Sequence, residues 1–286
     1  MIQKVISHQD GYHPELPSFR DRYLGVDEDI VRMSYSGIFL PERRRYITGG
    51  IATQFYCNPE HRRGSNDIDV NDLDRLTSEE FRSRMAEDLL IVDERSPSFP
   101  DYNAILMNKN HSFVLHICNF FLTESSKFYF NVEFSRYSAQ HHQRMLDIFY
   151  REFDNSKEYC VNDVQLRVLD PADIIARKIR RLINYYKYEE ISEFSPPADP
   201  KEHLDIIWNQ REKLSRIELY ASKGCPECGE ESVAEKTILR SMTDIYDIKL
   251  LGSSEFFDAE YFEEVLKEYE KHGVDRKEVD KIFTPI

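Results

Sequence analysis

The residues from Tyr46 to Val70 constrain the fold more than any other part of this sequence. Tyr46-Ile-Thr-Gly-Gly-Ile-Ala-Thr-Gln-Phe55 predicts a short strand over 46–48, a turn at Gly49-Gly50 and then a helix over 51–56. Asn66-Asp-Ile-Asp-Val70 alternates polar and apolar residues, which is typical of a second strand. This order of elements indicates a mixed α and β protein.

Two aspartates, Asp67 and Asp69, stand on one face of the predicted second strand, because strand residues two positions apart point the same way. Carboxylates that close repel each other, and a hard divalent cation between them removes the repulsion. Mg²⁺ prefers one or two carboxylates plus phosphate oxygens, and Mn²⁺ is the alternative ion. Gly49 and Gly50 would let a triphosphate approach the backbone, and the helix that follows presents N–H groups to it.

This combination resembles the nucleotidyltransferase superfamily, whose signature is Gly-Gly or Gly-Ser followed later in the chain by Asp-x-Asp. Gly49-Gly-Ile-Ala52 and Arg63-Gly-Ser-Asn-Asp-Ile-Asp69 look more closely like the AbiEii type, the toxin component of bacterial abortive-infection toxin–antitoxin systems. Two later motifs of that family have counterparts in Leu169-Asp-Pro-Ala-Asp-Ile-Ile-Ala-Arg-Lys178 and in Asp199-Pro-Lys-Glu-His-Leu-Asp205. The resemblance covers about residues 28–215, and the tail from Arg216 has no counterpart.

The last motif departs from the family pattern. Many relatives have Arg or Lys directly before its aspartate, whereas this chain has Ala198-Asp199 and a separate Leu204-Asp205. Either aspartate is therefore a candidate for the role.

The resemblance implies a Mg²⁺-dependent enzyme that moves a nucleoside monophosphate from an NTP to an acceptor and releases pyrophosphate. Asp67 and Asp69 would hold the metal, and Lys178 would offset charge that develops on the triphosphate. Glu133 or Asp205 would help to activate the acceptor hydroxyl. The residues implied for nucleotide binding are Gly49, Gly50, Arg63, Ser65 and Lys178.

Glu133 and Lys178 each have an ordinary structural alternative. The superfamily usually adds a carboxylate from a later strand, and Phe130-Asn-Val-Glu-Phe134 has strand character, but Glu133 also suits an outward-facing strand position. Lys178 is expected at the border between the apolar stripe of its helix and solvent. From there it reaches either a phosphate or only the solvent.

Further arginines surround these candidates. Arg177, Arg180 and Arg181 make one conspicuously basic helix, which suits a triphosphate, an RNA backbone or plain solvent. Arg62 and Arg63 stand close to the aspartates in sequence and are expected to hold phosphate or to compensate the two carboxylates.

The remaining pattern predicts an α+β protein with two domains. Residues 1–165 form the nucleotidyltransferase catalytic domain, with a polymerase-beta-like fold and a mixed sheet, and residues 166–286 form an all-helical domain. Two more strands are expected within 103–118 and 127–134. Helices are expected over 27–40, 78–90, from Asp170 to a break at Ser195-Pro-Pro197, and over 203–214, 232–250 and 258–272.

Composition narrows the partners. Lys+Arg 38 against Asp+Glu 52 gives a net charge of −14, which argues against unspecific coating of nucleic acid. Five cysteines, an odd number, and a start without a signal-peptide core favour a cytoplasmic protein, and no stretch is apolar enough for a membrane span.

Cys225 and Cys228 have the spacing of half a zinc site but lack a second pair, so a turn without a zinc role in catalysis is expected. His141-His142 reads as surface or partly buried histidines.

Two alternatives to an AbiEii-like toxin acting on tRNA or a protein side chain stay open. A small-molecule nucleotidyltransferase of the antibiotic-modifying kind suits the acidic charge, since its acceptor would be cationic. A non-catalytic module that binds RNA or a protein partner could use the same fold. The expected partners of the leading hypothesis are an NTP, the acceptor and a cognate antitoxin.

Overall fold

The computed structural model describes residues 43–65, 67–74, 80, 100–106, 113–121, 129–137, 143–161, 164–185, 197–222 and 226–283. These residues divide into two compact units. Of the described residues, unit 1 takes in those from position 43 to Phe55 and from Gly64 to Asp170, and unit 2 takes in Tyr56–Arg63 and those from Pro171 onward. The short segment Tyr56–Arg63 thus belongs with the C-terminal helices, although it lies between two elements of unit 1 in the sequence.

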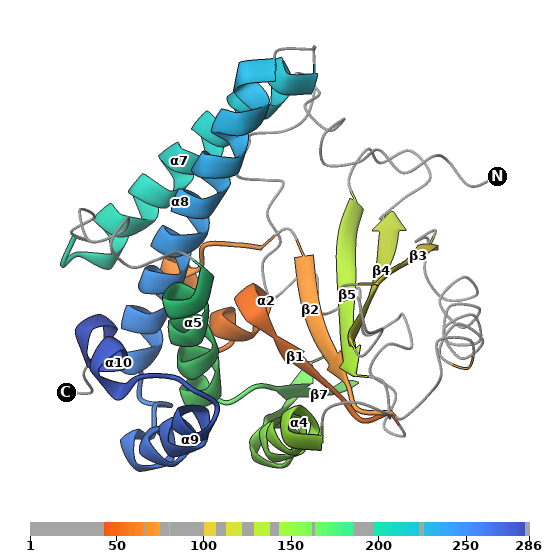
Figure 1. Cartoon of the computed structure of the whole chain (residues 1–286), viewed down its shortest axis with the longest axis vertical. Helices are drawn as coiled ribbons and strands as arrows, with labels where there is room; N and C mark the ends of the chain where they lie inside the picture. The colour runs from red at the N-terminus through yellow and green to blue at the C-terminus, as the bar shows by residue number, and fades with distance from the viewer. Residues whose placement is uncertain are drawn as a thin grey trace. The chain divides into compact units, whose positions relative to one another are not determined.

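Unit 1 is built on a seven-stranded mixed sheet with the order β3-β4-β5-β2-β1-β7-β6 (Figure 1). The pairs β1–β7 and β2–β5 are parallel, and the other neighbouring strands are antiparallel. The strands are β1 (Arg45–Thr48), β2 (Asp67–Asp72), β3 (Pro100–Leu106), β4 (Phe113–Phe121), β5 (Tyr129–Tyr137), β6 (Lys157–Val161) and β7 (Val164–Val168).

Two helices of unit 1 are described, α2 (Gly49–Gln54) and α4 (Gln143–Asn155). The core of the unit lies around β1, whose four residues are all buried. The apolar residues of this core include Ile47, Ile51, Ile68, Val70, Ile148 and Leu166.

A buried polar network crosses the same core. The Tyr46 hydroxyl donates a 2.5 Å hydrogen bond to Glu152, and the Asn71 amide donates to the Tyr46 hydroxyl at 2.6 Å. Arg45 pairs with Asp72 at 2.6 Å, and both side chains are almost fully buried. These mutual hydrogen bonds offset the cost of burying polar groups beside the central strands.

In unit 2 every described regular element is a helix. Helix α7 packs along α8, and α5 contacts both α8 and α9 (Figure 1). Helix α5 buries the stripe that the sequence predicts, including Ile175, Ile179 and Leu182. The helices are η2 (Pro59–His61), α5 (Pro171–Tyr185), α7 (Pro200–Ser222), α8 (Pro226–Gly252), α9 (Ala259–Lys271) and α10 (Arg276–Ile282).

The structure confirms the mixed α and β class and the strands predicted over 46–48 and 66–70. The prediction of one strand over 103–118 was wrong, because β3 and β4 form an antiparallel pair there. Helices α4 and α10 and the strands β6 and β7 were not predicted, and α7 and α8 run longer than expected. The helices expected over 27–40 and 78–90 lie outside the described residues except for Glu80.

The main part of unit 2 begins at Pro171, whereas the sequence suggested a division near residue 165. The difference arises because β7 extends to Val168 and pairs with β1 through Val168 and Ile47. Among the described helices, none combines the length and the apolar character that a membrane span requires.

Candidate functional site

The glycine turn lies directly against one of the predicted metal ligands. Gly49 follows β1 with φ +67°, a conformation that favours glycine. A Cβ built at Gly49 would lie 1.8 Å from Oδ2 of Asp69 and 2.7 Å from its Cγ. Both the backbone conformation and the lack of space therefore require glycine here, and Asp69 occupies the room that a side chain would fill.

The sheet register gathers further acidic positions around Asp69. Strand β2 pairs with β1 through Thr48 and Asp69, so Asp69 lies beside the residue that precedes the glycine turn. On its other side β2 runs parallel to β5, and there Asp69 pairs with Glu133 and Asp67 with Asn131. Paired positions of neighbouring strands share a face of a sheet, so positions 67, 69 and 133 lie on one face.

For Asp67 and Glu133 the description stops at the backbone. Among the side chains that are described, no group of three or more His, Cys, Asp or Glu residues has a geometry that could hold a metal ion. The oxygen donors of a carboxylate set at positions 67, 69 and 133 are nevertheless the type that Mg²⁺ takes.

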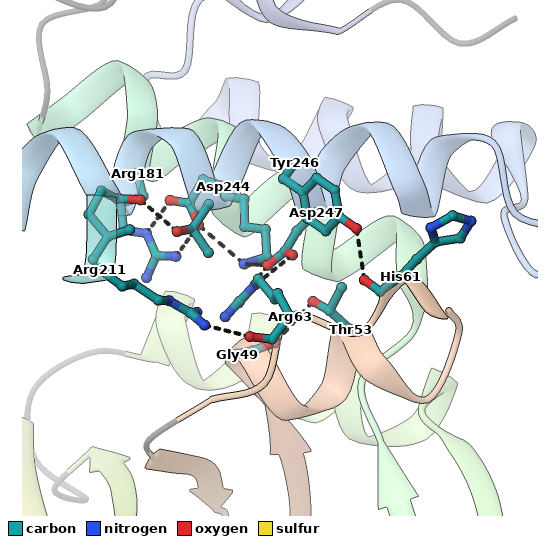
Figure 2. A network of polar contacts seen from close by, with 12 residues as sticks. Gly49, Thr53, His61, Arg63, Arg181, Arg211, Asp244, Tyr246 and Asp247 are labelled. Carbon is teal, nitrogen blue, oxygen red and sulfur yellow. Dashed lines mark hydrogen bonds and ion pairs between the residues drawn. The ribbon is translucent and has the colours of Figure 1, made fainter. Parts of the chain in front are cut away.

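Ser65 and Gly64 form the approach to β2. Ser65 is buried, and Gly64 has φ +66°. The Thr53 hydroxyl donates a hydrogen bond to the Gly49 carbonyl at 3.2 Å (Figure 2), one turn back within α2, which begins at Gly49 itself and not, as predicted, after a turn at Gly49-Gly50.

Arg63 forms a buried bidentate ion pair within unit 2. Its Nε and Nη2 donate to the two carboxylate oxygens of Asp247 on α8 at 2.8 and 2.7 Å (Figure 2). Burial alone would raise the pKa of Asp247, but the positive charges of Arg63 and Lys178 outweigh it and lower that pKa to about 2. Asp247 is therefore ionised at neutral pH, and Arg63 is held by its charge.

Lys178 belongs to the same cluster. Its Nζ lies 2.7 Å from Asp247 Oδ2 and 3.1 Å from Asp244 Oδ1, and Arg181 forms a bidentate pair with Asp244. We use "ion-pair cluster" for Arg63, Lys178, Arg181, Asp244 and Asp247. Lys178 is only 3% exposed, whereas the sequence placed it at the border of core and solvent. The difference arises because α8 supplies two carboxylates that make burial of the ammonium group tolerable.

Asp244 and Asp247 were not among the predicted residues, and both lie in the tail that has no counterpart in the family resemblance. Their spacing of three positions places both on one side of α8, beside the buried residues Tyr246 and Ile248. Two aspartates on an otherwise apolar helix face were the signal, because buried carboxylates need cationic partners.

The other predicted residues lie elsewhere. Asp205 is exposed on α7, and Asp199 accepts a hydrogen bond from the Lys201 backbone N–H at 2.9 Å at the start of that helix. Arg180 lies over the Tyr269 ring at 5.7 Å. The ion-pair cluster and the Asp69 face belong to different units, so the prediction that Lys178 points toward Asp67 stays a prediction.

Of the cysteines and histidines named in these predictions, the structure describes Cys228. Cys228 is half-buried near the start of α8, while Cys225, His141 and His142 lie outside the described residues. The expectation of a turn without a zinc role at Cys225 and Cys228 therefore stays a prediction.

Two neighbours of the ion-pair cluster are kept uncharged at neutral pH. Burial raises the pKa of the Cys57 thiol to about 12, and Asp247 adds to the effect. Burial also lowers the pKa of His203 to about 4, with a contribution from Lys249. Cys57 is therefore a poor nucleophile and His203 is neutral, so the charges here are those of the arginines, lysine and aspartates.

Comparison with known proteins gives little beyond this geometry. No family model matches the chain, and a search of curated proteins found no significant match. Among solved structures, the chain is similar to an antigenic nucleotidyltransferase-like protein from Paracoccidioides brasiliensis, with 13% identity and a TM-score of 0.39 over 91% of this chain and 94% of that one. A similarity this low assigns neither a fold family nor a function.

Proposed function

We propose that this protein is a Mg²⁺-dependent nucleotidyltransferase that transfers a nucleoside monophosphate from an NTP to an acceptor hydroxyl. One observation carries the proposal: the Asp69 carboxylate fills the space over Gly49, where any other residue would clash with it. The glycine turn and the Asp-x-Asp strand, which the sequence joins in one motif, thus meet in space. The Gly49 backbone and the Asp69 carboxylate therefore lie side by side. A metal–triphosphate complex needs both, the backbone for its phosphates and the carboxylate for its metal.

Asp67, Asp69 and Glu133 would hold the metal, because the strand register gathers these three acidic positions on one face of the sheet. A bound Mg²⁺ would neutralise charge on the phosphate oxygens. In the transfer, the acceptor oxygen forms a bond to the α-phosphorus and the bond from that phosphorus to the β-phosphate oxygen breaks. Pyrophosphate leaves, and Glu133 or Asp205 takes the proton of the acceptor hydroxyl.

Lys178 is the cation that the family resemblance assigns to the triphosphate, and Arg181 lies beside it in the ion-pair cluster. Both bind Asp244, and Lys178 also binds Asp247. Arg181 has a side chain that is 45% exposed, whereas that of Lys178 is 4% exposed. Arg181 is therefore better suited than Lys178 to meet a phosphate from solvent.

The sequence motifs lead us to propose the AbiEii type among nucleotidyltransferases. On that reading the protein is a cytoplasmic toxin, its acceptor is tRNA or a protein side chain, and a cognate antitoxin is its partner. A cationic small molecule is the alternative acceptor, and the acidic net charge of −14 favours it electrostatically.

The test is transfer of label from each of the four α-³²P-labelled NTPs with Mg²⁺ and, separately, total RNA, cell-extract protein or a mixture of cationic antibiotics. We expect label in one acceptor class, lost in Asp69→Asn and kept in Asp258→Asn, whose carboxylate only caps α9. Label in RNA or protein supports the toxin, and label in the small molecules supports the alternative. No transfer to any acceptor would favour a binding module and contradict the proposal.

A further inference from the structure

Side-chain hydrogen bonds link β1 and β2 of unit 1 at the end of the strand pair that lies away from Gly49. Arg45 and Asp72 are register partners, and Nε of Arg45 donates to Oδ2 of Asp72 at 2.6 Å. Tyr46 and Asn71 are the next partners, and the Asn71 amide donates to the Tyr46 hydroxyl at 2.6 Å. Two successive register positions thus carry a side-chain link in addition to the pairing of the two backbones.

The two links lie on opposite faces of the sheet, because successive side chains of a strand point to opposite sides. On the face of Tyr46 the chain of hydrogen bonds continues to α4, where the Tyr46 hydroxyl donates to Glu152 at 2.5 Å. Each of the four linked strand residues is buried, with at most 2% of its surface exposed. Buried links of this kind hold firmly, because breaking one leaves polar groups without water or partner. The two strands are therefore held together from both faces.

The same register lays Asp69 over Gly49. Thr48 and Asp69 are register partners two residues along from Tyr46 and Asn71, and Gly49 follows directly. Asn71 and Asp69 thus share one face of β2. Any movement of β2 along β1 at Asn71 is passed on to Asp69 through two residues of extended strand.

The apolar residues of these strands leave the register partly open. A shift of β1 against β2 by two residues would keep Ile68 and Val70 on the same face, so the apolar burial would survive. Such a shift would carry Asp69 about 7 Å away from Gly49. It would also separate Tyr46 from Asn71. The buried polar links therefore select the register that the apolar pattern alone does not.

We infer that Tyr46 and Asn71 are positioning residues that hold β1 and β2 in the register that places the Asp69 carboxylate over Gly49. The inference rests on the proposed function of Asp69 as a metal ligand. Tyr46 and Asn71 act through the two strands and contribute no group to the transfer itself. A metal site needs its carboxylates held within a fraction of an ångström, which a strand pair fixed from both faces supplies.

The experiment compares Tyr46→Phe with Tyr261→Phe in the full chain. The Tyr261 hydroxyl donates to the buried Asp173 at 2.8 Å, so each change removes one hydrogen bond to a buried carboxylate, but only Tyr46 belongs to the β1–β2 pair. Asn71→Ala is a further variant, because it removes the cross-strand bond and keeps the bond from Tyr46 to Glu152. The readouts are the Mn²⁺ dissociation constant from electron paramagnetic resonance, kcat of nucleotide transfer, and deuterium uptake of peptides that cover β1 and β2.

We expect Tyr46→Phe and Asn71→Ala each to weaken Mn²⁺ binding and to lower kcat by about fivefold, the effect of one hydrogen bond. Both should also speed deuterium uptake in β1 and β2. Tyr261→Phe should lower the unfolding midpoint but keep the wild-type Mn²⁺ constant, kcat and uptake in these strands. A merely structural role of Tyr46 and Asn71 would lower the unfolding midpoint without changing the Mn²⁺ constant of the folded protein.

The inference is overturned if Tyr46→Phe and Asn71→Ala keep the Mn²⁺ constant and the deuterium uptake of Tyr261→Phe. If Tyr46→Phe does not fold, Asn71→Ala decides alone. A wild type that transfers no nucleotide would contradict the proposed function instead. Deuterium uptake and the Mn²⁺ constant would then still decide whether Tyr46 and Asn71 hold the strand that carries Asp69.

Discussion

Two closely spaced pairs of aspartates in this chain, Asp67/Asp69 and Asp244/Asp247, have different surroundings. Asp67 and Asp69 stand on a strand, two positions apart, beside a glycine turn and in register with Glu133. Asp244 and Asp247 stand on a helix, three positions apart, and bind Arg63, Lys178 and Arg181. The helix pair has its counter-charges within its own unit, while the strand pair is in register with a further acidic position. The ion-paired aspartates of the helix stabilise the fold of unit 2, whereas the aspartates of the strand suit a cation that arrives from solution.

The comparison is tested most strongly by removing charge from the helix pair. Asp247→Asn leaves Arg63 and Lys178 buried without their shared carboxylate, which should lower the free energy of unfolding by about 3–5 kcal/mol. Urea denaturation followed by circular dichroism measures the change. Asp280→Asn is the control, because its ion pair with Arg276 is largely exposed and should contribute less than about 1 kcal/mol. Similar losses in the two variants would mean that the ion-pair cluster does not stabilise unit 2.

Removing charge from the strand pair should lower activity and leave stability nearly unchanged. Asp69→Asn should lower kcat of nucleotide transfer by about 100- to 1,000-fold, since the metal loses a charged ligand. Its unfolding midpoint should equal that of the wild type or rise slightly, because a repelling charge is gone. Steady-state transfer and thermal unfolding on the same preparation give both numbers. A large loss of stability would instead assign Asp69 a role like that of Asp247.

The two aspartate pairs also differ in whether the sequence alone predicts them. The strand, glycine turn and second strand followed from local patterns, because alternation and glycine act within a few residues. Asp244 and Asp247 were missed because their partners are distant in sequence: Arg63 precedes Asp247 by 184 positions and Lys178 precedes Asp244 by 66. Non-local pairing leaves no periodic signal in a single sequence.

The misassigned region between 103 and 118 has a different cause. The apolar residues on both sides of 107–112 suggested one continuous strand, whereas β3 and β4 are two strands that pair antiparallel. Helix α4 was missed because its buried face carries Glu152 as well as Ile148 and Phe149, which weakens the apolar stripe.

The glycine turn offers a smaller, geometric test. Gly49→Ala would place a methyl group on the Asp69 carboxylate and hold alanine at φ +67°, so it should cost about 1–3 kcal/mol of stability and abolish transfer. Gly273→Ala is a matched control, because it has φ +89° but no atom within 4 Å of the added Cβ. Gly273→Ala should lower the free energy of unfolding and leave nucleotide transfer unchanged. Full transfer activity in Gly49→Ala would show that Asp69 can leave this position without consequence.

Lowering the pH should give the smallest of these effects, and it acts on Asp247 of the helix pair. The pKa of Asp247 falls from 3.8 to about 2 on folding, so the folded state binds fewer protons than the unfolded chain between these values. This contribution to stability is complete above about pH 4 and is lost as the pH falls toward 2. The wild type should therefore lose stability across that window faster than Asp247→Asn, measured by urea titrations at several pH values. Parallel curves would contradict the lowered pKa.

The central claim is that the strand carboxylates bind a divalent cation, and Mn²⁺ binding followed by electron paramagnetic resonance tests it most directly. Titration of the full chain in the presence of a non-hydrolysable NTP analogue should remove free Mn²⁺ signal to at least one ion per chain. Asp69→Asn should lose that binding, while Asp258→Asn should retain it. A wild type that binds no Mn²⁺ above the level of Asp69→Asn would contradict the account.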